Sequence, residues 1–300
     1  MVFFNEYFQG VAEVELLGFS SKNPRYIPKE YLDQEVFTIF RTCHSYGDWV
    51  ILSAMPRLIK QKYPNSKVII PSPDCILKYF SPSNWKNKHD NPFNNVIEVF
   101  ANNPYVDGMI DEIPKNFPVY HDHFRLYEEN NPHIPLVKQM LSFWRFSEEE
   151  MQDCEPELYW SKEEIDQGNN IIKNLFEGKE FGFLYLDDSF FYSINMEESE
   201  IQRRRDIIQR EISKHDVPWI YFSGKDKFRY ITNNEVLDVS SIEMSLRVQN
   251  YVKSHAKVII GHQGGYGTDC MSRYSKCYVV PLTKNQVREH IQLKTTYLHD

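Results

Sequence analysis

The chain has 300 residues, enough for two domains of ordinary size, each with its own core. Its hydrophobic fraction of 41% and charged fraction of 25% exclude disorder as the main state. The net charge of −8 argues against a general nucleic-acid binder, because such affinity depends mainly on Lys and Arg side chains that neutralise phosphates. One basic run, Arg203 to Arg205, is interpreted as a solvated helix face, with a phosphate contact as the alternative.

The five cysteines include no CxxC pair and indicate reduced thiols. No stretch approaches the roughly 20 apolar residues that cross a bilayer, and the start of the chain lacks the pattern of a signal peptide. We therefore expect a cytoplasmic protein without stable membrane insertion. Peripheral association with a membrane stays open.

Strand and helix patterns alternate along the first half, which favours a parallel sheet covered by helices. The expected strands are residues 36–41, 67–70, 96–100 and 108–110. Apolar side chains recur at helical spacing from Trp49 to Ile59, which predicts a helix between the first two strands. Residues 73–95 and 114–135 are rich in loop-forming residues, and each is expected to be a long loop with one short helix.

The second half repeats this alternation and predicts one Rossmann-like lobe. The expected helices are residues 162–176, 198–214, 242–254 and 269–274, and the expected strands are 181–186, 217–222, 236–239, 257–260 and 276–280. An acidic stretch that ends in Pro156 indicates the domain boundary. The predicted organisation is an N-terminal extension (1–34), an N-terminal domain (35–155) and a C-terminal domain (156–300).

A glycine junction, Tyr46-Gly47-Asp48, follows the first strand and opens the first helix. A carboxylate at a helix N-terminus is held in its charged form, which suits Asp48 to act as a general base. The alternative is that Asp48 only caps the helix, which contributes about 1 kcal/mol. His44, in the same loop, is the reserve candidate for the base.

A second glycine junction follows the strand 257–260. Closely spaced glycines let backbone N–H groups approach a ligand at a helix start, which is a natural anion site. The residues that we expect to bind a phosphate-bearing donor here are His262, Gln263, Gly264, Gly265, Gly267 and Thr268. The alternatives are a tight connection without a ligand and, for His262, a buried hydrogen-bonded histidine. Gly224 and Lys225, after the strand 217–222, are either a nucleotide contact or a solvated turn.

Residues 41–56, together with residues 63–68 and the later segment 256–261, resemble glycosyltransferase family 9, the ADP-heptose heptosyltransferases. The resemblance implies a GT-B fold, an α/β architecture in which two Rossmann-like domains face each other across a cleft. The first domain would bind the acceptor and the second the donor. Where the family usually has an acidic residue, a small residue and Gly, this chain has Gln263-Gly264-Gly265, and Thr268 replaces the family's His. We therefore do not carry over ADP-heptose as the donor.

These features predict a glycosyltransferase, hexosyl- or heptosyltransferase-like, that moves a sugar from a nucleotide-diphosphate sugar to a glycan, a glycolipid or another hydroxyl acceptor, with inversion. We expect no cofactor and no metal, because Asp187-Asp188 lacks the DxD spacing of metal-dependent sugar transferases and His121-Asp122-His123 has no identifiable third ligand. Two alternatives stay open: a nucleotide-sugar epimerase on the same fold, and a catalytically inactive binding protein.

Overall fold

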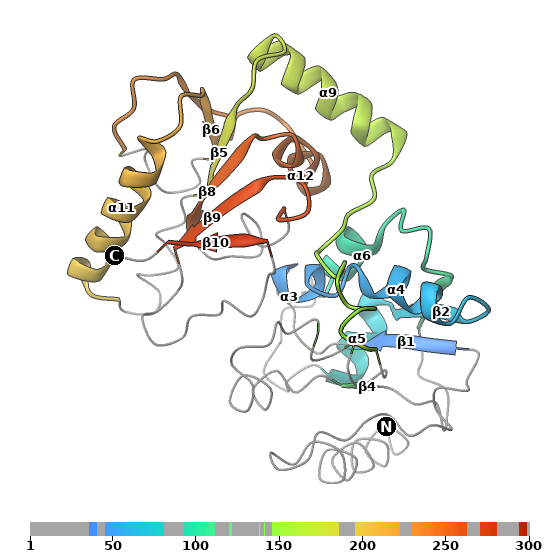
Figure 1. Cartoon of the computed structure of the whole chain (residues 1–300). Helices are drawn as coiled ribbons and strands as arrows, with labels where there is room; N and C mark the ends of the chain where they lie inside the picture. Colours follow the sequence, from blue (N-terminus) through green and yellow to red (C-terminus); the bar gives the residue numbers. More distant parts are fainter. Residues whose placement is uncertain are drawn as a thin grey trace. The chain divides into compact units, whose positions relative to one another are not determined.

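A computed structural model of the chain divides into two compact units, Met1–Tyr159 and Trp160–Asp300 (Figure 1). The structure describes residues 36–40, 46–80, 93–111, 120–121, 138, 141, 146–185, 196–222, 230–262, 271–280 and 294–298. The division lies slightly after the boundary expected between residues 155 and 156.

Contacts of the neighbouring side chains explain where the division lies. The N–H of Glu157 donates to Ser53 Oγ over 2.8 Å, which holds Glu157 in the first unit. The indole Nε1 of Trp160 donates to the carbonyl oxygen of Arg247 over 3.0 Å, which holds Trp160 in the second unit. The change from one unit to the other therefore occurs directly after Tyr159.

The first unit contains a four-stranded parallel sheet in the order β3-β2-β1-β4. Its described elements are β1 (Val36–Phe40), α3 (Tyr46–Val50), α4 (Met55–Lys62), β2 (Lys67–Pro71), α5 (Pro73–Phe80), α6 (Asn95–Phe100), β3 (Gly108–Ile110) and β4 (Tyr120–His121). The chain begins the sheet with β1, adds β2 and β3 on one side of it, and then places β4 on the other side.

Two expectations for the first unit are wrong. Residues 96–100, predicted as a strand, form helix α6. Their buried side chains are Val96, Val99 and Phe100, a helical spacing of three and four residues that the run of β-branched residues concealed. In addition, Tyr120–His121, inside a predicted loop, forms β4 because it pairs with the end of β1.

The helix expected from Trp49 to Ile59 is interrupted between α3 and α4. Residues 51–54 form turns, in which the N–H groups of Leu52 and Ser53 donate to the third preceding carbonyl oxygens, those of Trp49 (2.9 Å) and Val50 (3.1 Å). Pro56 lies at the start of α4. Because proline lacks an N–H and its ring clashes with the carbonyl four residues earlier, a continuous helix cannot run through this position.

The second unit contains a six-stranded parallel sheet in the order β10-β9-β8-β5-β6-β7. Its described elements are α9 (Lys162–Phe176), β5 (Gly182–Tyr185), α11 (Glu198–Ile212), β6 (Trp219–Tyr221), β7 (Val236–Asp238), α12 (Leu246–Ser254), β8 (Val258–His262), β9 (Lys276–Val280) and β10 (Thr295–Tyr297). The described part of the helix expected at residues 269–274, Met271 to Tyr274, forms a turn instead.

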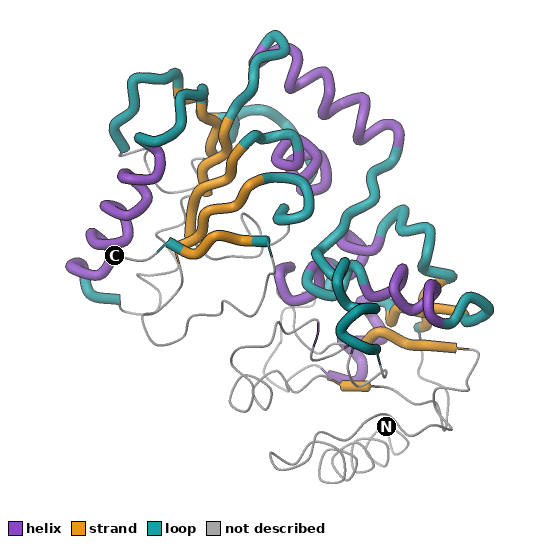
Figure 2. The backbone as a smooth tube through the Cα atoms, in the orientation of Figure 1, coloured by secondary structure: helices purple, strands orange, loops and turns teal. Residues whose placement is uncertain are grey.

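Helices cover both faces of the second sheet, with α11 and α12 on opposite sides (Figures 1 and 2). The buried apolar residues of α11, including Ile207 and Ile208, pack with Leu184, Val258 and Ile260 from the sheet. Full burial of one such side chain contributes about 1.5–3 kcal/mol. This core fixes α11 against the sheet.

Helix α9 packs against α12, the helix on the sheet face opposite to α11. Ser161 caps α9 and forms a reciprocal capping box with Glu164. Gly168 of α9 lies against the ring of Tyr251 of α12, where a Cβ atom would collide with the ring. The absence of a side chain at residue 168 therefore allows the two helices to approach closely.

Candidate functional site

The strand order of the second sheet identifies where a ligand would bind. The chain enters this sheet at β5, adds β6 and β7 on one side, and then adds β8, β9 and β10 on the other. This is the order 3-2-1-4-5-6 of dinucleotide-binding folds, in which ligands bind outside the carboxyl ends of the strands where the direction of winding reverses. In this unit that position is the carboxyl edge of β5 and β8.

His262 is the last residue of β8 and pairs in register with Val280. Because side chains alternate along a strand, His262 shares the sheet face of Val258 and Ile260, which is the face that α11 covers. Its exposed fraction is 2%. His262, which was predicted to bind the phosphate-bearing donor, is thus a buried histidine directly before the glycine junction.

Gly261 lies opposite Tyr185 where β8 and β5 end. A Cβ atom at residue 261 would collide with the carbonyl oxygen of Tyr185. The two strands therefore approach each other closely at the point where the winding reverses, and the lack of a Cβ atom at residue 261 makes room for this approach.

The first unit repeats this relationship on a smaller scale. Strand β1 lies between β2 and β4, so the winding of this sheet reverses between β1 and β4. Helix α3, which carries Gly47 and the backbone of Asp48, is the next described element after β1. The predicted base thus also belongs to the segment that follows a strand at a reversal point, with residues 41–45 between the strand and the helix.

Buried side chains hold α3 in place. Tyr46, Trp49 and Val50 are all fully buried, whereas Gly47 is partly exposed. After the helix, Ser53 Oγ donates to the carbonyl oxygen of Val50 (2.6 Å) and accepts from the N–H of Glu157 (2.8 Å). The helix backbone at residue 48 is therefore held by the buried side chains of α3 and by the hydrogen bonds of Ser53 after the helix.

Most of the other predicted site residues lie outside the described residues. These are His44, Gly224, Lys225, Gln263, Gly264, Gly265, Gly267 and Thr268, together with the side chain of Asp48. The structure thus brings Gly261 and His262 to the reversal point of one sheet, and Gly47 and the Asp48 backbone to the helix that follows the reversal strand of the other.

A polar pair that sequence analysis missed lies on α12. Lys253 has an exposed fraction of 2%, and its Nζ donates to Asn250 Oδ1 over 3.4 Å. The same Nζ lies 5.1 Å from the ring centre of Phe183 on β5 and 5.5 Å from that of Phe222, directly after β6. The available signal in the sequence was the spacing of three residues, which places the two polar side chains on the same face of a helix.

The arginine run on α11 is not the solvated helix face that we expected. The side chain of Arg204 has no exposed area, and its Nε lies 3.2 Å from Glu200 Oε1. Arg203 donates to both carboxylate oxygens of Glu200 (2.8 and 2.9 Å). The pKa of Arg204 is lowered, mainly because the side chain is buried. The charge of Arg203 lowers this pKa further, and the charge of Glu200 opposes both effects. The neighbouring carboxylate indicates a structural role.

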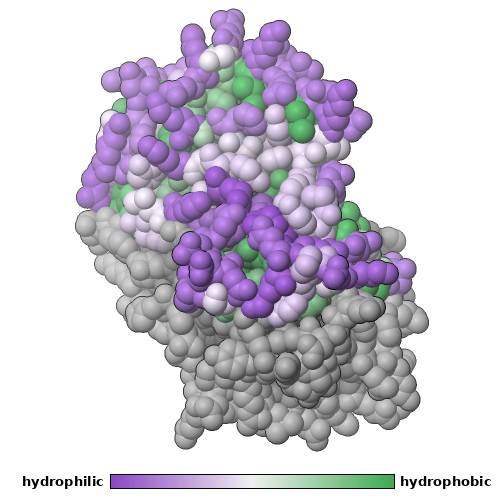
Figure 3. Space-filling view, turned by 45° about the vertical axis from the view of Figure 1, so that its right-hand side comes forward, coloured by the Kyte–Doolittle hydropathy of each residue, from purple (hydrophilic) through white to green (hydrophobic). Residues whose placement is uncertain are grey.

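The described residues contain neither a metal-binding cluster nor a membrane-spanning helix. Within those residues, no group of three or more His, Cys, Asp or Glu side chains could hold a metal ion. No helix in the same part of the chain is both long enough and apolar enough to cross a membrane. On the face drawn in Figure 3, the described surface is mostly hydrophilic and its hydrophobic areas are small and separate.

No family model and no curated protein matches the chain. Among solved structures, a glycosyltransferase family 9 protein from Veillonella parvula is similar with a TM-score of 0.49 and 8% identity over 88% of this chain and 85% of that chain. The ADP-heptose lipopolysaccharide heptosyltransferase II of E. coli is similar with a TM-score of 0.44 and 10% identity over 88% and 90%. Assignments of individual site residues therefore depend on this chain's own sequence and geometry.

Proposed function

We propose that the protein is a glycosyltransferase that moves a sugar from a nucleotide-diphosphate sugar to a hydroxyl group of a glycan, a glycolipid or a related acceptor. One observation supports this most. Each of the two glycine junctions in the sequence follows a strand at which the winding of its own parallel sheet reverses. Two such positions in one chain suit a reaction that needs one donor and one acceptor.

In this proposal the second unit holds the nucleotide diphosphate. Residues Gly264, Gly265, Gly267 and Thr268 follow β8 directly, and their N–H groups would bind the phosphate oxygens. Lys225, which follows β6, would add a positive charge. Hydrogen-bond donors and a cation can stabilise the leaving diphosphate, so we also propose that no metal or cofactor takes part.

The first unit would supply the base. Asp48 would take the proton from the acceptor hydroxyl while the hydroxyl oxygen attacks the anomeric carbon of the donor sugar. The bond between that carbon and the phosphate oxygen breaks at the same time, and the nucleoside diphosphate leaves with the electron pair. Attack from the side opposite the leaving group inverts the anomeric configuration. The buried anchoring of α3 supports this role, because a base needs a fixed position.

Turnover of a panel of nucleotide sugars, with and without glycan acceptors, tests the proposal. Release of the nucleoside diphosphate that depends on an acceptor, and persists in EDTA, supports metal-independent transfer. Formation of an isomeric nucleotide sugar without an acceptor would identify an epimerase. Nucleotide binding without any turnover would identify a binding protein. Loss of turnover in EDTA that manganese or magnesium restores would reject the metal-independent mechanism.

A further inference from the structure

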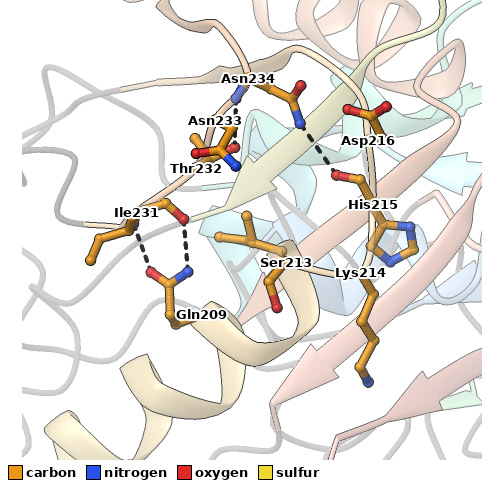
Figure 4. Close-up of a pocket in the computed structure, with 10 residues that line it drawn as sticks. Gln209, Ser213, Lys214, His215, Asp216, Ile231, Thr232, Asn233 and Asn234 are labelled. Carbon is orange, nitrogen blue, oxygen red and sulfur yellow. Dashed lines mark hydrogen bonds between the residues drawn. The ribbon is translucent and has the colours of Figure 1, made fainter.

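A hollow of about 350 Å³, drawn in Figure 4, lies near the start of β6 and the start of β7 in the second unit. The end of α11 and the residues that lead from it into β6 form one wall. Residues 231–234, which lead into β7, form the other. Because the strands are parallel, the amino ends of β6 and β7 lie at the edge away from the carboxyl end of β8. The hollow is therefore separate from the predicted donor site.

Hydrogen bonds hold the two walls in a fixed arrangement. The side-chain amide of Gln209 donates to the carbonyl oxygen of Ile231 (2.8 Å) and accepts from its N–H (2.7 Å) (Figure 4). Asn234 Nδ2 reaches the carbonyl oxygen of His215 over 3.5 Å, and the N–H of Asn234 donates to Thr232 Oγ1 (3.1 Å). These contacts connect the segment before β7 to α11 and to the segment before β6, so the hollow is formed in advance of any ligand.

The charges around the hollow do not favour an anion. Lys214 is paired with the buried carboxylate of Glu211 over 2.7 Å, and His215 lies 3.1 Å from the same carboxylate. Asp216 adds a negative charge to the lining. Among the described residues that line the hollow, the imidazole of His215 is the only aromatic ring, so these residues offer a stacked nucleobase little support.

Several polar groups of the lining are available to a ligand. Asp216 and Asn233 are exposed, and within the part of the chain that the structure describes their side chains make no hydrogen bond or ion pair. A carboxylate accepts hydrogen bonds, and a side-chain amide both donates and accepts them. Together with the hydroxyl of Thr232, they match a ligand that carries several hydroxyl groups.

We propose that this hollow is a second binding site, for a neutral sugar unit, held through Asp216, Asn233 and Thr232. Its volume falls in the range of roughly 300–1,000 Å³ that small-molecule sites occupy. The site is distinct from the predicted donor site, and it does not depend on whether the protein transfers sugars.

Titration of the full-length protein with glucose, N-acetylglucosamine and maltotriose, followed by calorimetry, tests the proposal. The sugar concentration extends to roughly 20 mM, because a site with few contacts has a dissociation constant in the millimolar range. We expect saturable binding of at least one sugar, weakened about tenfold or more in Asp216→Ala and in Asn233→Ala. Asp166→Ala, which changes an exposed carboxylate on α9, is the matched control and should bind as the parent does.

Three outcomes would overturn the proposal. The first is no saturable binding of any of the three sugars. The second is binding that both lining variants leave unchanged. The third is binding of inorganic phosphate or calcium that the same variants abolish while sugars do not bind. Both substituted side chains are exposed, so thermal unfolding should show that both variants are folded. If one variant fails to fold, sugar binding by the other variant decides between these outcomes.

Discussion

Arg57 and Glu157, 100 residues apart in the sequence, form a buried ion pair in the first unit. Arg57 Nε lies 2.8 Å from one carboxylate oxygen and 3.2 Å from the other, and Nη2 donates to the carbonyl oxygen of Asp153 (2.7 Å). Burial lowers the pKa of the guanidinium, but the hydrogen bond and charge of Glu157 outweigh it and raise that pKa. The pair fixes the last segment of the first unit to α4.

Removal of the carboxylate of this pair should be strongly destabilising. Glu157→Ala leaves the charge of Arg57, whose side chain is only 10% exposed, without this partner. The half-exposed carboxylate of Asp153, 3.1 Å from Nη2, still offsets part of that charge. We therefore expect the free energy of unfolding to fall by about 3 kcal/mol, measured by chemical denaturation. Glu148→Ala is the control, because it removes a more exposed pair, with Lys138, and should cost about 0.2–1 kcal/mol. Equal effects of the two variants would contradict the argument.

Gly261→Ala should destabilise the second unit. The added methyl group meets the carbonyl oxygen of Tyr185, so β8 and β5 must separate at their carboxyl ends. We expect a loss of about 1–3 kcal/mol, followed by denaturant unfolding monitored through tryptophan fluorescence. Gly108→Ala is the control, because a Cβ atom there has no neighbour within 4 Å. A Gly261→Ala protein as stable as the control would show that the strands can relax.

Gly265→Val should weaken the binding of a nucleoside diphosphate, under the proposed function. A branched side chain would keep phosphate oxygens away from the backbone N–H groups. We expect an affinity loss of about tenfold or more, which is about 1.4 kcal/mol, in calorimetric titration. Gly108→Val serves as the control in the other unit. If the folded Gly265→Val protein binds as tightly as the parent, the phosphates bind elsewhere.

Asp48→Asn should abolish sugar transfer and leave nucleotide affinity nearly unchanged. An amide cannot take the proton of the acceptor hydroxyl, and such a base contributes about 10²- to 10⁴-fold in rate. The measurement is kcat with acceptor present, beside calorimetric nucleotide binding. Asp111→Asn, an exposed carboxylate after β3, is the control. Turnover within a few-fold of the parent would sink the assignment to Asp48 and favour His44.

The contribution of Glu164 to stability should depend on pH. Burial raises the pKa of this carboxyl, but hydrogen bonds from Arg247 and from the N–H of Ser161 outweigh it and bring the pKa below its ordinary value of 4.5. Because the folded state then binds the proton less readily than the unfolded state, the stabilisation is complete above the ordinary value and is lost as the pH falls through the folded pKa.

Chemical denaturation of the parent and of Glu164→Gln between about pH 7 and pH 3 tests whether this stabilisation is lost in acid. We expect the parent to be more stable at neutral pH and the difference to shrink as the pH falls below the ordinary glutamate value of 4.5. A difference that is constant over the whole range, or that grows in acid, would mean that the charge of Glu164 does not provide the stabilisation.

Local patterns in the sequence determined most of the regular elements. The bounds of α9 were predicted as the structure has them, and the capping box that fixes its start involves only the neighbouring residues Ser161 and Glu164. Strand β3 was likewise predicted at its observed bounds. The two glycine junctions were also visible, since glycine after an apolar strand is a feature of neighbouring residues.

Only the tertiary structure decided which strands are neighbours, that Val96–Phe100 is helical, and that Glu157 reaches Arg57. Strand β4 has two residues and exists because Ile39 and Phe40 of β1 pair with it, far away in the sequence. Arg204 was expected to be solvated, yet the packing of α11 buries it completely. Local propensities are small compared with the free energy of burial and pairing between distant segments, so sequence periodicity fixes an element only where no distant contact competes with it.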